Sequence, residues 1–412
     1  MNKVVKKKFR QHLSKIFILI IICFLILKTN FVFASEVFSS NISTDDVSKT
    51  TEEVTNNITE STRKTYNLDE YIDTINNSVN ENLGQEIDFK NIANELLNKN
   101  DINHKNLFTK LLEIFASEVS SAIKGTVTIF IIVIIMAILS NLELDNKSDI
   151  TRIAHLACFI VIATLTVATF VQTVNMLKTT INTMGTLMQV ISPFLLSVLI
   201  ATGKISTTGI IQPLLLFLAS SVGFIVTYFV IPLLSISVAF NVICSISENI
   251  RLEKLSKFFS NVSLWTIGVV LTVFLGVLSL ETSLSSSVDS LSVKTTQAAV
   301  SNFVPVVGKF FSDSFEVVVG ATKIIGKTGG IIGILGIVIV GIIPIFKITS
   351  IMVIYMLLAA FVEMITTDKL ILKYLSGFVN VYKTMLGILI GVVILFVIST
   401  GIILNLINSI VT

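Results

Sequence analysis

The chain has 412 residues, of which 53% are hydrophobic and 14% are charged, and its mean hydropathy is +0.86. Soluble domains carry about 25% charged residues, so most of this chain is predicted to lie in lipid. The net charge is +3. The sequence has no basic patch interleaved with aromatic residues and therefore gives no support to nucleic-acid binding.

Residues 1–34 are predicted to be a secretory signal peptide. A basic start precedes an apolar run of 12 residues from Ile16 to Leu27, and small residues precede a cleavage position after Ala34. An uncleaved N-terminal anchor is the alternative, although the run is short for a span of about 20 residues. Both readings export the segment that follows.

The exported segment is predicted to have two parts. Residues 35–65 are rich in Ser, Thr, Asn and acidic residues, a composition typical of disorder. Residues 66–124 are predicted to form a small helical extracytoplasmic domain, which either docks a partner or acts as a spacer. Its first set of apolar residues at helical spacing is Leu68, Tyr71, Ile72, Ile75 and Val79.

Long apolar runs then predict an all-α polytopic membrane protein with about seven to nine transmembrane helices. A transmembrane bundle is assigned to 125–280 and C-terminal transmembrane helices to 330–412. Pro232 interrupts the run 210–247, which predicts two spans that turn at the proline. The expected spans are 125–140, 153–176, 185–201, 210–231, 233–247, 262–280, 330–346, 348–366 and 384–407.

The distribution of basic residues predicts the orientation in part. With 36–124 outside, the basic segments 141–152 and 248–257 lie inside, in agreement with the positive-inside rule. The same count places the C-terminus inside and Lys369, Lys373 and Lys383 outside, against the rule. One span assignment near 282–329 or 368–383 is therefore expected to be wrong.

Residues 281–329 are predicted to be an amphipathic or re-entrant segment, because they are too polar to cross a bilayer and too apolar to lie free in water. This segment is either a gate or docking surface, or a connector that covers its neighbours. Gly329 and Gly333 form a small-xxx-small pair that allows close helix contact, within one chain or between two copies. The candidate gating and packing residues are Asn302, Phe303, Pro305, Gly308, Asp313, Glu281, Gly329 and Gly333.

The sequence shows no metal-ligand spacing, nucleophile motif or phosphate loop, so no enzyme activity, cofactor or catalytic residue is predicted. Cys158 and Cys244 lie in apolar runs, where packing residues are expected. Polar groups within the runs are candidates for a transport site or for ordinary span-end positions. These residues are Asn175, Gln212, Glu281 and Glu363.

The chain resembles the stage III sporulation protein AE family over about residues 66–410. The stretch that carries the resemblance is SNFVPVVGKFFSDSFEVVVGATKIIGKTGGIIGI at 301–334, with support from 192–203, 272–300 and 339–348. The resemblance implies a subunit of a secretion-like channel between mother cell and forespore, in the mother-cell-derived outer forespore membrane. The implied partners are other stage III sporulation membrane proteins, an associated ATPase and ring-forming proteins of the intermembrane space. Membrane lipid and a second copy of the chain are further expected contacts.

Two other functions fit the same residues. A self-contained solute permease would explain many spans with a few buried polar groups, although no internal repeat with matched broken helices is visible. A membrane scaffold that recruits partners and conducts nothing is equally compatible with the sequence.

Overall fold

The structure is a computed structural model, and it describes residues 60–83, 89–91, 94, 104–145, 149–246, 252–303, 307–365 and 369–408. The predicted signal peptide, most of the polar segment 35–65 and Pro305 lie outside these residues. The chain divides into two units at residue 57, and the following description concerns the second unit. Its described residues contain helices and no strand, which confirms the all-α fold class.

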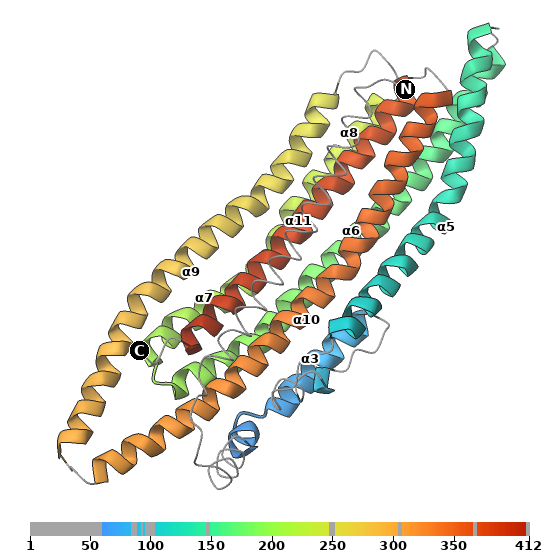
Figure 1. Cartoon of the computed structure of the whole chain (residues 1–412). Helices are drawn as coiled ribbons and strands as arrows, with labels where there is room; N and C mark the ends of the chain where they lie inside the picture. The colour runs from blue at the N-terminus through green and yellow to red at the C-terminus, as the bar shows by residue number, and fades with distance from the viewer. Residues whose placement is uncertain are drawn as a thin grey trace. The chain divides into compact units, whose positions relative to one another are not determined.

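Backbone polar groups in lipid must be satisfied within the segment itself, so apolar spans fold as helices. The described helices are α3 (Leu68–Leu83), α5 (His104–Asp145), α6 (Asp149–Ala201), α7 (Ile205–Ile225), α8 (Ile231–Cys244), α9 (Glu253–Phe303), α10 (Val307–Ile365) and α11 (Lys369–Asn408). A π-helical turn, η1 (Val226–Val230), joins α7 to α8. Figure 1 shows α6, α10 and α11 running alongside one another.

The described residues contain six helical stretches that are long and apolar enough to cross a membrane, so the predicted count of seven to nine is not confirmed. The predicted pair 153–176 and 185–201 lies within the single helix α6, and the pair 330–346 and 348–366 lies within α10. Polar residues interrupt the apolar runs in these helices, so hydropathy predicts two spans although the helical backbone is continuous.

The predicted turn at Pro232 is wrong, because the backbone continues from α7 through η1 into α8. Pro232 lies in the first turn of α8, where its missing N–H costs least. The preceding π-helical turn changes the hydrogen-bond register, and the amide of Ile231 donates to the carbonyl of Val226. The irregular turn therefore accommodates the proline without a reversal of the chain.

Successive long helices run in opposite directions, so their junctions gather at two ends of the bundle (Figure 1). We call one of them the basic end, because the starts of α6, α9 and α11 carry Arg152, Lys254, Lys257, Lys369 and Lys373. The far end holds the α6–α7 junction and the start of α10. The basic residues 369 and 373 thus join the other basic segments at one end, whereas Lys383 lies 14 residues farther along α11. The division of α10 into two expected spans had placed these residues on the opposite side.

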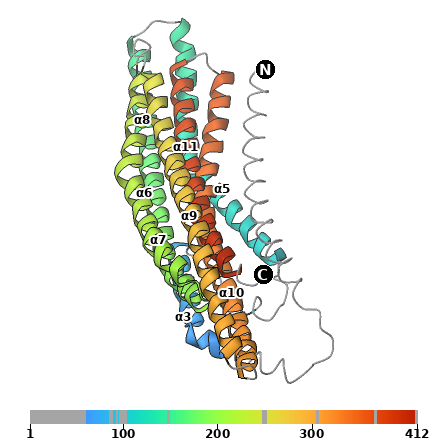
Figure 2. The same ribbon diagram turned by 90° about the vertical axis from the view of Figure 1, so that its left-hand side faces the viewer.

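The core of the bundle is formed mainly by α10 and α11, which pack against each other and against α6. Helix α9 lies against α8 and α11, and α7 lies against α6 and α9, as Figure 2 shows from the side. Helix α3 packs on α10 and α6 towards the far end. Its buried residues are Leu68, Tyr71, Ile72, Ile75 and Val79, the same five that the sequence pattern placed on one face.

Candidate functional site

A row of glycines on α10 permits close helix packing in the described bundle. We call Gly326, Gly329, Gly330, Gly333 and Gly336 the glycine seam. A Cβ on Gly329 would overlap the ring of Phe194 on α6, and a Cβ on Gly330 would overlap Leu404 on α11. A Cβ on Gly333 would lie 2.9 Å from the hydroxyl of Tyr71 on α3. The seam therefore brings α3, α6 and α11 against α10 within one chain.

Tyr71 closes the glycine seam on the side of α3. Its hydroxyl donates a hydrogen bond to the carbonyl oxygen of Gly329 over 2.9 Å. Its ring stacks on Phe194, with centroids 4.1 Å apart and planes 14° from parallel. The buried phenol thus has a partner for its polar atom and an aromatic partner for its ring, so it can fix the position of α3.

An ion pair holds the residues just before α3. Arg63 pairs with Asp69 through Nε and one terminal nitrogen of its guanidinium, and its Nε donates to Oδ2 over 3.1 Å. The guanidinium of Arg63 lowers the pKa of the Asp69 carboxyl, so this contribution to stability is present near neutral pH and is lost in acid. The pair is partly exposed and contributes little free energy.

The buried phenol of Tyr71 predicts a pH dependence in alkali. Burial raises the pKa of Tyr71 above its ordinary value of about 10. The neutral phenol is therefore favoured in the folded state, and its contribution to stability is present below pH 10 and lost as the pH rises further. Thermal unfolding of the detergent-solubilised protein should show a larger loss between pH 9 and pH 11 for the wild type than for Tyr71→Phe. Equal losses in the two proteins would contradict this assignment.

Hydroxyl and amide side chains join other helices through buried hydrogen bonds. Thr166 on α6 bonds to the hydroxyl of Tyr374 on α11, and the amide of Asn241 on α8 donates to the backbone carbonyl of Tyr374 over 3.1 Å. Ser237 and Ser256 each donate to the backbone carbonyl of the other over 2.8 Å. Such bonds in an apolar bundle contribute about 0.6 kcal/mol each and fix the relative position of neighbouring helices.

The structure places the predicted site residues in several different surroundings. Gly329 and Gly333 lie in the seam, whereas Glu281, Asn302, Phe303, Gly308 and Asp313 lie on α9 and α10 in a part where only the backbone is described. The segment 281–329 comprises the end of α9 and the start of α10. Its gating role stays a prediction.

The polar residues predicted within the spans show no common site in the described part of the structure. Asn175, Gln212 and Glu363 are exposed on three different helices. Among the described residues, no three His, Cys, Asp or Glu side chains lie close enough to hold a metal ion.

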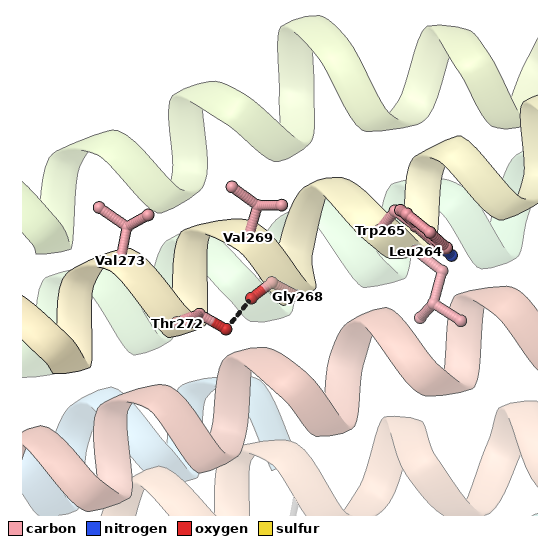
Figure 3. A pocket seen from close by; sticks show the side chains of 6 residues that line it. All are labelled: Leu264, Trp265, Gly268, Val269, Thr272 and Val273. Atoms are coloured by element: carbon pink, nitrogen blue, oxygen red, sulfur yellow. Dashed lines mark hydrogen bonds between the residues drawn. The ribbon is translucent and has the colours of Figure 1, made fainter.

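A shallow hollow of about 510 Å³ lies on the exposed side of α9 (Figure 3). It is lined by Leu264, Trp265, Gly268, Val269, Thr272 and Val273. The hydroxyl of Thr272 donates to the carbonyl of Gly268 over 2.8 Å, so this hydroxyl is already satisfied. This surface suits apolar contact, with lipid or protein, and offers no group for chemistry.

Comparison with known proteins decides the family. A sequence profile described as stage III sporulation protein AE matches residues 87–406. The chain belongs to this family. Stage III sporulation protein AE of Bacillus subtilis (strain 168) is 26% identical over 237 residues, which are 57% of this chain and 59% of that protein. The alignment thus covers less than two thirds of this relative's length. No solved structure matches the chain.

The match confirms the resemblance to the stage III sporulation protein AE family and supports a role in sporulation. The family description names a stage of sporulation and no reaction. Together with the six apolar helices, it describes a multi-pass membrane protein of sporulating cells. The matched region of the family includes the whole glycine seam, whereas Tyr71 precedes it.

Sequence reasoning placed Tyr71 on an apolar face but did not identify its contact with Gly329. Tyr374 and Asn241 were missed altogether. The available signal for these residues of the sporulation protein was a polar atom within an apolar run, since a buried phenol or amide needs a hydrogen-bond partner. The identity of that partner depends on helix packing and cannot be predicted from the local sequence.

Proposed function

We propose that this protein is an integral-membrane, non-catalytic subunit of a multi-protein, secretion-like channel between mother cell and forespore that endospore formation requires. The observation that carries this proposal is the family match over residues 87–406, which contains five of the six apolar helices and nearly all of the sixth. The expected location is the mother-cell-derived outer forespore membrane.

The basic end of the bundle is proposed to face the mother-cell cytoplasm. Cytoplasmic ends of membrane proteins carry an excess of Lys and Arg, and the starts of α6, α9 and α11 supply them at this end. Helix α3 and the start of α10 then face the intermembrane space. An associated ATPase would meet the basic end, and ring-forming proteins would meet the far end. Residues 281–329 would lie near the channel opening.

A clean deletion of the gene tests the proposed function. The deletion strain is expected to grow normally and to form no heat-resistant spores, with arrest after engulfment, and the intact gene should restore spores. The measurements are growth rate and the count of heat-resistant colonies, with and without complementation.

Normal sporulation of the deletion strain would overturn the proposal. Solute uptake by the purified protein alone in liposomes would instead favour a permease. Normal growth with lost spores and no conductance in any reconstituted assembly would favour a scaffold within the same sporulation role.

A further inference from the structure

The long helices of this bundle exceed the thickness of a bilayer. Helix α6 has 53 residues and α10 has 59, which correspond to about 80 Å and 90 Å at 1.5 Å per residue. The hydrocarbon core of a bilayer is about 30 Å thick. Lipid can therefore surround only part of the bundle, and the exposed side chains can show which part.

The exposed face of α6 changes character at one position. From Ile153 to Val171, the described exposed residues are Ile153, Leu156, Ala157, Ile160, Val161, Thr164, Ala168 and Val171. The hydroxyl of Thr164 is bonded to the carbonyl of Ile160 over 2.8 Å. From Gln172 to Gln189, every exposed residue is polar: Gln172, Asn175, Lys178, Thr179, Asn182, Thr186 and Gln189. The apolar part rises about 27 Å, close to the thickness of a hydrocarbon core.

Helix α5 shows the same change. Before residue 122 its described exposed residues are Glu113, Ala116, Ser117, Ser120 and Ser121. After it, large apolar residues are exposed: Ile123, Val127, Ile131, Ile135 and Ile138. Lys124 lies beside the change, where its long side chain can reach the polar side.

The two changes lie at one level of the bundle. A Cβ on Gly341 of α10 would lie 2.8 Å from Met184 of α6, so residues 341 and 184 lie at the same height in the bundle. The two helices are antiparallel. Twelve residues closer to the basic end, residue 353 of α10 therefore lies level with residue 172 of α6. Phe130 of α5 packs edge-on against Phe361, with centroids 5.7 Å apart. Helices α5 and α10 run in the same direction. Eight residues before this contact, residue 122 of α5 therefore lies level with residue 353 of α10. We call this position the Val353 level.

On the basic side of the Val353 level, two other helices also expose large apolar residues. Helix α10 exposes Leu357, Phe361 and Met364, and α8 exposes Ile236 and Ile243. Beyond the level, α3 covers the glycine seam and turns Glu70, Asp73, Asn77 and Glu81 outwards. Acidic side chains facing lipid would be strongly unfavourable. The side formed by α7 and α9 is different, since it also exposes large apolar residues beyond the level, among them Phe217 and Trp265.

We propose that, on the side formed by α3, α5 and α6, the hydrocarbon core of the bilayer ends at the Val353 level. Beyond that level, the side formed by α3, α6 and the start of α5 faces water. The apolar residues of α10 and α11 beyond the level form a protein core: α3, α6 and α11 cover the seam. The structure thus assigns a lipid surface to the part of α5 and α6 nearest the basic end, and a hydrated surface to the same side of the far half.

Spin-label accessibility of the full-length protein in lipid nanodiscs tests this boundary on two helices. After replacement of Cys23, Cys158 and Cys244 by alanine, single cysteines are introduced at exposed positions and labelled with a nitroxide. The far-half positions are Ser117→Cys, Thr186→Cys and Gln189→Cys, and the matched basic-half positions are Ile131→Cys, Ile153→Cys and Ile160→Cys. Collisions with a water-soluble nickel chelate and with oxygen are measured for each label.

Hydrocarbon excludes the polar nickel chelate and concentrates oxygen, so the ratio of nickel to oxygen collisions should be about tenfold higher at the far-half positions. Oxygen-dominated collisions at Thr186 and Gln189, equal to those at Ile160, would overturn the boundary. Low collisions with both reagents at these positions would also overturn it, because the surface would then be covered by protein. Size-exclusion profiles that match the cysteine-free protein identify folded variants, and the paired positions allow for the loss of any single variant.

Discussion

Gly329→Leu is expected to destabilise the packing of α3, α6 and α10 by about 3 kcal/mol or more, because inserted methylene groups strain a filled core. The Cβ alone would overlap the ring of Phe194, and Phe194 is held in turn by the stacked ring of Tyr71. Neither ring can move without disturbing the other. The detergent-solubilised variant should unfold at a lower temperature and lose most of its monodisperse fraction.

Gly320→Leu is the matched control for this change. It lies on the same helix, and a Cβ at this position would meet nothing within 4 Å. It should therefore retain nearly the wild-type unfolding temperature. Equal losses for the two variants would show that leucine disturbs α10 through the backbone and that the glycine seam has no special role.

Tyr71→Ala is expected to release α3 from the bundle without unfolding the remaining helices. Removal of a buried aromatic side chain costs about 3 kcal/mol or more, whereas Tyr71→Phe removes only the hydrogen bond to Gly329 and should cost about 1 kcal/mol. Amide hydrogen exchange reports such local opening. Protection of the α3 amides should fall about 100-fold for the alanine variant and about fivefold for the phenylalanine variant.

Asn77→Ala provides the control, because Asn77 lies on the exposed face of α3. Its α3 amides should exchange at nearly the wild-type rate. If Tyr71→Ala left their protection unchanged as well, the apolar residues Ile72, Ile75 and Val79 would suffice to hold α3.

Local sequence patterns predicted the parts of this fold that depend on local composition. The spacing of five apolar residues predicted the buried face of α3, because residues three or four positions apart lie on the same side of a helix. These residues are Leu68, Tyr71, Ile72, Ile75 and Val79. The small-xxx-small spacing of Gly329 and Gly333 likewise indicated close helix contact. Both inferences require only helix geometry.

The number of spans could not be predicted in the same way, because hydropathy does not distinguish lipid from a protein core. The polar residues near Lys178 divided α6 into two expected spans, yet they lie on one exposed face while Thr173, Leu177 and Ile181 are buried. Pro232 seemed to require a turn because the π-helical register of η1 depends on packing. The contact of Tyr71 with Gly329 depends on residues that are distant in the sequence and has no local signal.

The seam between α3 and α10 also determines an order of events during synthesis. The hydrogen-bonded residues Tyr71 and Gly329 are 258 positions apart, and at about 5–20 residues per second the ribosome needs about 13–50 s to pass from one to the other. During this interval α3 has been made but its partner helix has not. Until α10 is inserted, the apolar face of α3 must be covered by a membrane surface or a chaperone. The contact between α3 and the glycine seam therefore forms late in assembly.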